Sequence, residues 1–332
     1  MKFYIHLVTL ALVSSISTGA SDKPKQDGKA LIEEAENKAD IFALPSFELK
    51  ADVRIENLGK MVEGSYLFFW NGPEEWREEI SLPGYSEIQV GGKGVMFVKR
   101  TTDFLPLRIE QLHSALGYGT GGSPRSTFVR MGPLPHETVK KIRDRNEKGL
   151  RLSCVEIESV LNAYKITREV CVDQSSGTLV RQGQFLDKNS MPVGTKTFPT
   201  FLSYVEDGKS LVEVQITELK ISEPWPPSTF EPPQGATSRS GCMNPSPAYL
   251  LKQTPPKYPD QERATHTEGK VSIYALIGND GVPRGLRVVS GATSGLNSAS
   301  LDAVQQWRYA PPTCNDHAAD VETIITITYK MS

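Results

Sequence analysis

The residue types that most often do chemistry are scattered along this chain. Four glutamates, at positions 74, 75, 78 and 79, flank Trp76 and Arg77, and two of them could in principle form an acid–base pair. Carboxylates in such a strand-like run are more simply exposed along a solvated strand edge. Of the five histidines, His113 lies in an apolar run typical of a helix, so we expect a structural role for it.

Short catalytic motifs are also absent from the sequence. It contains no GxSxG, HExxH, Walker or kinase signature. The glycine-rich run at 117–126 (GYGTGGSPRS) lacks the lysine and the following helix of a phosphate-binding loop, so we expect a surface loop. We therefore expect no enzyme activity, no cofactor and no bound metal.

The charge balance argues against one class of partner. The 332 residues include 37 basic and 39 acidic side chains, which gives a net charge of −2. No run of basic residues is present that could follow a phosphate backbone, so nucleic acid is not an expected partner. The length is sufficient for two domains, each with its own core.

The first twenty residues have the layout of a secretory signal peptide. Lys2 precedes an apolar run, and small residues follow up to Ala20, after which cleavage is expected. The alternative is an uncleaved membrane anchor, but the apolar run is shorter than the roughly 20 residues of a comfortable span. Residues 1–20 therefore predict export of the chain.

The cysteines are even in number, as expected of disulfides in an exported protein. Cys154 and Cys171 lie in two segments that are predicted to be adjacent strands, so we expect them to pair. Cys242 and Cys314 would then pair across the C-terminal region. Four cysteines allow three connectivities, and none of their spacings matches a zinc site.

The N-terminal two thirds of the chain has the texture of a β-domain. Residues 21–45 contain a single short helix, with Leu31 and Ala35 on its apolar side. From 46 to 232, apolar and polar residues alternate in segments separated by turn signals such as Pro83-Gly84. A helix is expected to interrupt these strands at 105–116. The pattern predicts one curved antiparallel sheet with little helix.

The C-terminal region has a different texture. Residues 233–253 are rich in proline, serine and glycine and are expected to be a linker. Residues 254–332 predict a short helix, then a β-hairpin that turns at Asp280-Gly281, then a second helix and a closing strand. Trp307 is expected near the end of the second helix, as the aromatic anchor of a small core.

This C-terminal region resembles the C-terminal domain of the TonB family. The resemblance implies a three-stranded antiparallel sheet packed with two helices, so the whole chain is expected to be α+β. Its spacing holds over about 75 residues. The matching signature is Tyr258, Pro259, Gly269, Gly281, Gly291, Trp307, Arg308, Tyr309 and Pro311.

The TonB resemblance implies that the last strand offers its edge to an extended segment of an outer-membrane receptor or another envelope protein. An uncovered edge of this kind invites pairing, so a second copy of the chain or a covering segment is another candidate occupant. The alternative is an ordinary edge strand capped by its own tail. Thr326 and Thr328 would lie on the face away from Tyr329. The residues expected to bind are Val321, Thr323, Ile325, Thr326, Ile327, Thr328 and Tyr329.

Residues 46–232 loosely resemble LolA-like periplasmic lipoprotein-carrier proteins, which are curved, incomplete β-barrels wrapped around helices. This resemblance rests on strand pattern. It implies an apolar cavity for a lipid or acyl chain, with Leu67, Phe69, Val95 and Phe97 as candidate lining residues. The alternative is that these four residues simply fill a core.

The two resemblances together predict a non-enzymatic periplasmic protein that binds an envelope partner through its C-terminal module. A lipid or lipoprotein carrier with a docking module is a second hypothesis. A third is an energy transducer anchored in the inner membrane and working with ExbB–ExbD. The short linker and the cleavable N-terminal segment are departures from a standard TonB and weaken the third hypothesis.

Overall fold

The computed structural model describes residues 25–117, 137–161, 164–242, 245, 248–314 and 316–331. The expected signal peptide at 1–20, and all but the first residue of the glycine-rich run at 117–126, lie outside the described residues. Among those that are described, no helix combines the length and apolarity needed to cross a membrane.

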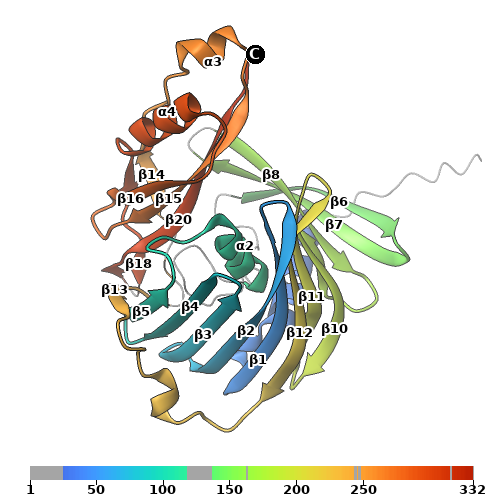
Figure 1. Cartoon of the computed structure of the whole chain (residues 1–332). Coiled ribbons are helices and arrows are strands. Elements are labelled where there is room, and N and C mark those ends of the chain that lie inside the picture. The colour runs from blue at the N-terminus through green and yellow to red at the C-terminus, as the bar shows by residue number, and fades with distance from the viewer. Residues whose placement is uncertain are drawn as a thin grey trace, which may run out of the picture.

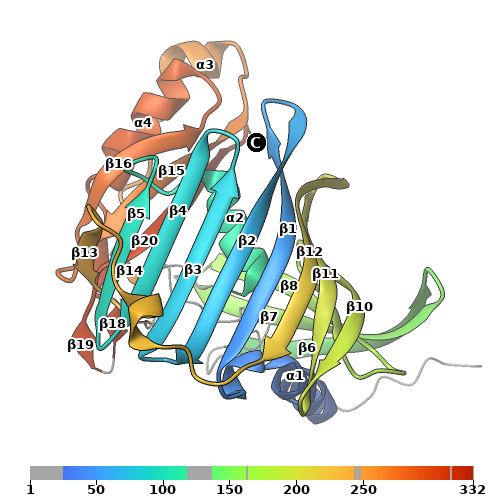
Figure 2. The same cartoon turned by 60° about the horizontal axis from the view of Figure 1, so that its bottom comes forward.

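One antiparallel sheet of thirteen strands dominates the chain and curves into an open half-barrel (Figures 1 and 2). The strand order is β13-β5-β4-β3-β2-β1-β12-β11-β10-β9-β8-β7-β6, so nearly every strand pairs with its neighbours in sequence. The strands are β1 (Phe47–Asn57), β2 (Lys60–Gly72), β3 (Glu75–Leu82), β4 (Tyr85–Gly92), β5 (Val95–Arg100), β6 (Glu137–Glu147), β7 (Leu150–Leu161), β8 (Tyr164–Asp173), β9 (Leu179–Gln182), β10 (Phe185–Val193), β11 (Lys196–Glu206), β12 (Lys209–Ile221) and β13 (Thr237–Ser240).

The concave face of the sheet holds the main core. Two helices, α1 (Lys25–Ala39) and α2 (Leu107–Leu116), pack against this face, mainly on β6 and β11 and on β11 and β12 respectively. In β1 the alternation of apolar and polar residues buries Leu49, Ala51 and Val53. The largest buried side chains are Phe47, Phe68, Trp70, Trp76 and Phe198.

Gly91 shows how tightly this core is packed. It lies opposite Trp76 in the β3–β4 register, and a methyl group built on it would lie 2.1 Å from ring atom Cζ2 of Trp76. Gly91→Ala is therefore expected to lower the free energy of unfolding by about 1–3 kcal/mol, because the indole must move in a filled core. Urea unfolding measures this loss. Ser65→Ala, on the exposed side of β2, is the control, and equal stability of the two variants would contradict the expectation.

The C-terminal module is a second, smaller unit. Its sheet has the order β16-β15-β20 and consists of β15 (Gly269–Ile277), β16 (Pro283–Ser290) and β20 (Val321–Tyr329). The helices α3 (Asp260–Ala264) and α4 (Ser294–Val304) complete it. Its core is separate from that of the half-barrel and includes Val271, Ile273 and Leu296. The predicted fold class, a curved half-barrel plus a small three-stranded module with two helices, is confirmed.

The second helix of the module ends earlier than its sequence indicates. Trp307 lies beyond α4, where the chain turns into the short strand β17 (Arg308–Ala310). The indole is nonetheless buried, and its Nε1–H donates a hydrogen bond of 2.8 Å to the carbonyl of Thr254. Trp307 is thus a core residue, as expected. Its hydrogen bond also joins the segment at Thr254, where the module begins, to the end of α4.

The segment expected as a linker contains two strands. β13 adds to β5 at the edge of the large sheet, and β14 (Tyr249–Lys252) pairs with β17 of the module. Between β13 and β14 the chain passes from one sheet to the other. Short polar strands such as β13 (TSRS) carry no apolar alternation, so the sequence offers no signal for this pairing.

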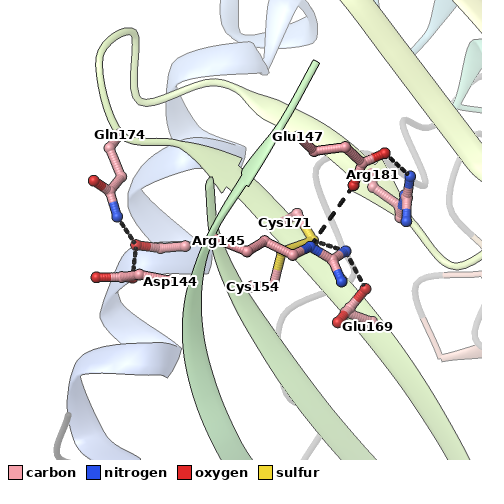
Figure 3. Close-up of a disulfide and its surroundings, with 9 residues drawn as sticks. Asp144, Arg145, Glu147, Cys154, Glu169, Cys171, Gln174 and Arg181 are labelled. Atoms are coloured by element: carbon pink, nitrogen blue, oxygen red, sulfur yellow. Dashed lines mark hydrogen bonds and ion pairs between the residues drawn. A yellow bond between two sulfur atoms is a disulfide. The ribbon is translucent and has the colours of Figure 1, made fainter. Parts of the chain in front are cut away.

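Both disulfides pair as predicted. Cys154 bonds to Cys171 across β7 and β8, where Arg145 lies beside it and reaches Glu169 (Figure 3). Cys242 bonds to Cys314, which lies in the short strand β18 (Thr313–Cys314). β18 pairs with β19 (His317–Ala318). The second disulfide joins the chain shortly after β13 to strand β18 of the C-terminal module.

Candidate partner-binding edge and buried junction

The free edge of the module sheet is on β20. This strand pairs with β15 without a register shift, from Gly269 opposite Tyr329 to Ile277 opposite Val321. Within the part of the chain that the structure describes, no strand pairs with its other side. The predicted last strand and its bounds therefore agree with the fold, while its role in binding stays a prediction.

The two faces of β20 have different surroundings. Ile325, Ile327 and Tyr329 are buried in the module core, and the hydroxyl of Tyr329 lies 2.8 Å from that of Ser300 in α4. Thr326 and Thr328 are exposed on the opposite face. A partner strand placed beside β20 would therefore meet backbone groups along its edge and small, polar side chains on one face.

The signature residues of the module are spread over its helix ends and turns. Tyr258 packs edge-on against Tyr329, with ring centroids 5.3 Å apart. Gly281 has a φ of +75°, and a side chain there would meet the backbone carbonyl of Tyr309. Gly269 opens β15 and Gly291 follows β16. Pro259 precedes α3, Arg308 is the first residue of β17, and Pro311 follows β17.

The other face of the module sheet rests on the half-barrel. Tyr274 and Ile324 join the core of the half-barrel, and Tyr274 contacts the ring of Phe104 at 6.2 Å between centroids. Lys270 bridges to Glu206, and Arg287 bridges to Asp103. The module sheet thus lies between its own helices and the half-barrel, and only part of β20 projects beyond this contact.

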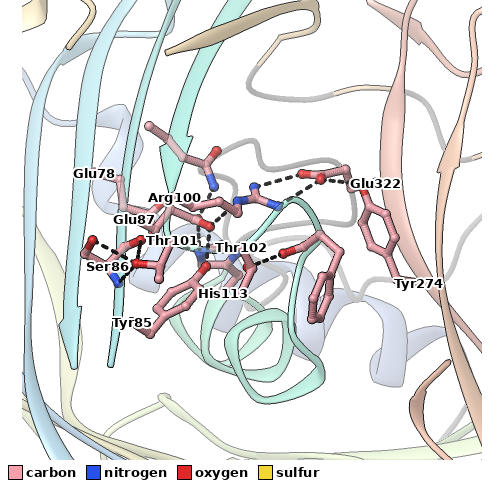
Figure 4. Close-up of polar contacts among 12 residues, drawn as sticks. Glu78, Tyr85, Ser86, Glu87, Arg100, Thr101, Thr102, His113, Tyr274 and Glu322 are labelled. Atoms are coloured by element: carbon pink, nitrogen blue, oxygen red, sulfur yellow. Dashed lines mark hydrogen bonds and ion pairs between the residues drawn. The ribbon is translucent and has the colours of Figure 1, made fainter. Parts of the chain in front are cut away.

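A buried ion network joins the two parts (Figure 4). Glu322 of β20 accepts hydrogen bonds of 2.9 and 3.0 Å from Arg100 of β5 and one of 2.7 Å from the hydroxyl of Tyr274. Arg239 of β13 lies 2.5 Å from the same carboxylate. Burial raises the pKa of Glu322, but Arg239 and Arg100 outweigh burial and hold it at about 2.

The network continues into the half-barrel through Glu87. Arg100 lies 2.7 Å from Glu87, which also accepts hydrogen bonds of 2.6 Å from Tyr85 and 2.5 Å from Gln89. Burial raises the pKa of this carboxyl, but Arg100 and His113 lower it well below its usual range. Both carboxylate oxygens of Glu87 thus accept hydrogen bonds.

Glu78 and His113 form the innermost part of the network, and the position of Glu78 corrects one expectation. Glu78 is 1% exposed, so it is not part of a solvated strand edge. His113 of α2 lies 3.3 Å from both Glu78 and Glu87. Burial raises the pKa of Glu78 to about 7. Burial lowers the pKa of His113, but Glu78 and Glu87 outweigh it and raise it to about 9.

The burial of Glu78 could have been predicted from the apolar residues around it, although the neighbouring charged residues indicate exposure. Trp76, Glu78, Ile80 and Leu82 are all buried because they share one face of β3 in a period of two. Arg100, Arg239 and Glu322 have no such signal. They come from β5, β13 and β20, and only the tertiary fold brings them together.

The four candidate cavity residues lie on the other face of the half-barrel. In β2, Tyr66, Phe68 and Trp70 are buried in the main core, whereas Leu67 and Phe69 alternate with them and are half-buried. Val95 and Phe97 likewise alternate with the buried Met96 of β5. Phe69 packs edge-on against Trp225 at 4.8 Å between centroids. The structure therefore places these four away from the helix-packed interior.

Comparison with known proteins gives a family match for the C-terminal module. Residues 254–331 match the family described as Gram-negative bacterial TonB protein C-terminal. No curated protein matches the chain. Among solved structures, the LolA superfamily protein NE2245 from Nitrosomonas europaea is 14% identical, with 61% of this chain and 97% of that chain covered and a TM-score of 0.38.

Two further solved structures are similar to parts of this chain. A putative outer membrane lipoprotein-sorting protein domain from Vibrio parahaemolyticus is 9% identical, covers 63% of this chain and 97% of its own, and has a TM-score of 0.37. The TonB C-terminal domain of Pseudomonas aeruginosa is 22% identical, covers 27% of this chain and 91% of its own, and has a TM-score of 0.23. The chain is thus a curved half-barrel followed by a module that matches the TonB C-terminal family model over residues 254–331.

Proposed function

We propose that this chain is a periplasmic envelope protein whose C-terminal module binds an outer-membrane receptor or another envelope protein by adding a strand to β20. The role is binding, without catalysis. The observation that supports it most directly is the unpaired side of β20 in a module that matches the TonB C-terminal family. Main-chain hydrogen bonds would supply affinity, and the exposed threonines would meet alternate side chains of the partner.

Because the module is docked on the half-barrel, the free edge of β20 is held in a fixed position. Glu322 anchors the beginning of β20 through Arg100 and Arg239, while Thr326 and Thr328 remain exposed. A partner strand would therefore pair chiefly with the second half of β20. The carrier alternative is less favoured, because the four candidate cavity residues face away from the interior.

A pair of proline variants tests strand addition. In an antiparallel edge strand, successive N–H groups point alternately to the neighbouring strand and to the free side. Thr323 and Thr326 are an odd number of residues apart, so their N–H groups point to opposite sides of β20. Proline at one of the two positions therefore breaks a hydrogen bond to β15, and proline at the other removes only an N–H on the free side. We expect one variant to destabilise the module and the other to fold normally but to lose at least tenfold in partner affinity.

Thr323→Val and Thr326→Val are the matched controls, since each keeps the N–H and a similar side-chain shape. Circular dichroism and thermal unfolding identify the folded proline variant, and co-purification with the envelope partner measures binding. If the folded proline variant binds as well as its valine control, strand addition at β20 is wrong. Light scattering of the purified chain separates a homodimer through this edge from a foreign partner.

Export, the transducer alternative and the domain division belong to the same proposal. We propose cleavage after Ala20 and divisions at 21–45, 46–232, 233–253 and 254–332. A chain retained in the inner membrane with ExbB–ExbD would instead indicate the transducer. Intact mass of the protein from separated periplasmic and membrane fractions distinguishes these outcomes.

A further inference from the structure

The innermost part of the ion network has hydrogen-bonding groups that are unsatisfied within the described structure. Glu78 is fully buried, yet among the described residues neither of its carboxylate oxygens has a hydrogen-bond partner. The oxygen Oε1 of Gln89, on the neighbouring strand β4, is equally buried and also lacks a partner in the described part of the chain. Glu87 and Glu322, by contrast, accept several strong hydrogen bonds.

The spacing of the cluster fits a metal ion better than a hydrogen bond. One ligand atom each from Glu78, Glu87 and His113 lies within 4.8 Å of the others, and His113 Nε2 is 3.3 Å from both carboxylates. A charge-assisted N–H···O bond is usually about 2.7–2.9 Å long. Ligands at about 2.0–2.2 Å from a tetrahedral zinc ion are separated by about 3.3–3.5 Å.

We propose that Glu78, Glu87 and His113 bind a divalent transition-metal ion, with Zn²⁺ as the best-fitting probe. Two carboxylates neutralise the ion, and the imidazole supplies the nitrogen ligand that such metals favour. The oxygen of Gln89 lies beside the cluster as an acceptor for a metal-bound water. This site joins β3 and β4 to α2, and the proposal does not rest on partner binding at β20.

The surroundings of Glu87 support a ligand role. Arg100, Tyr85 and Gln89 hold its carboxylate in place, as outer groups commonly do around a metal ligand. His113 lies on α2, and its Nε2 reaches Glu78 of β3 and Glu87 of β4 at 3.3 Å each. The spacing of Glu78, Glu87 and His113 along the chain does not predict a metal site, because the three residues come from β3, β4 and α2.

Zinc titration of the untagged full-length chain tests the site. The protein is unfolded, stripped with a chelator, and refolded with and without Zn²⁺, because the site is closed to solvent. We expect uptake of one Zn²⁺ per chain and a higher melting temperature. Co²⁺ in place of Zn²⁺ should give the visible absorption of a low-coordinate site.

Three variants locate the binding. Glu78→Gln and His113→Gln are expected to weaken zinc binding at least tenfold and to abolish the rise in melting temperature. Glu79→Gln is the matched control, because Glu79 lies on the opposite face of β3 and pairs with Arg77. If the Glu78→Gln variant does not fold, the number of Zn²⁺ ions bound per wild-type chain and the Co²⁺ absorption spectrum still test the proposal. No uptake by the refolded wild type, or equal binding by a folded Glu78→Gln variant, would overturn the proposal.

Discussion

Replacing Glu322 by glutamine is expected to lower the free energy of unfolding by about 3–5 kcal/mol. The carboxylate is buried and is shared by Arg100, Arg239 and Tyr274. Glutamine keeps its shape but leaves the buried guanidinium of Arg239 without a compensating charge, and breaking a buried ion pair from one side usually costs this much. Urea or thermal unfolding of the purified chain measures the loss.

A surface pair provides the control for this prediction. Glu63 has a side chain that is 79% exposed and lies 3.6 Å from Arg54, so Glu63→Gln is expected to change stability by less than about 0.5 kcal/mol. The double variant Glu322→Gln with Arg239→Gln should be less destabilised than the sum of the single variants, because the two partners are coupled. Similar losses for Glu322→Gln and Glu63→Gln would contradict the role assigned to the junction.

The second large effect is expected from the Cys242–Cys314 disulfide. Its cysteines are separated by 72 residues, and replacing both by serine should lower the free energy of unfolding by about 4 kcal/mol, because the bridge restricts the unfolded chain. The Cys154–Cys171 bridge spans only 17 residues, and its removal should cost about 3 kcal/mol on the same reasoning. Chemical unfolding of the two double-serine variants under identical conditions gives the comparison.

The order of the two losses is the informative result. If the bridge between Cys242 and Cys314 mainly holds the module against β13, its loss should also separate the unfolding of the module from that of the half-barrel. A single transition with the larger loss at Cys154 and Cys171 would show that loop length does not govern these bridges. In that case the local packing of Cys154 and Cys171 in their small buried cluster would dominate.

Local patterns predicted most of the fold. The alternation in β1, the turn at Asp280-Gly281 and the apolar run at 105–116 each specify an element through contacts close in sequence. Periodicity predicts a later end for α4 than the structure shows, because Trp307 is apolar and spaced as if helical. It is held instead by a hydrogen bond to Thr254. Side-chain periodicity alone cannot distinguish these two ways of burying an aromatic residue.

The candidate sites were less predictable for two physical reasons. A period of two separates the two faces of a strand but does not say which one turns inward. The sequence therefore predicts Leu67 and Phe69 at the interior, whereas Phe68 and Trp70 are the residues buried there. The ion network joins Arg100 to Glu322, which are 222 residues apart, and no local pattern encodes that contact. Charge at Glu78 suggested exposure, although its position between Trp76 and Ile80 implies burial.

Site-specific photo-cross-linking in living cells tests the central claim most directly. A photoreactive amino acid is placed at Thr326 or Thr328 on β20, and at Thr217, an exposed threonine on β12 of the half-barrel, as the control. The account predicts that the β20 positions cross-link to an extended segment of an outer-membrane receptor or another envelope protein, and that Thr217 does not. Cross-links from Thr217 alone, or none from β20 in cells that contain the folded protein, would contradict it.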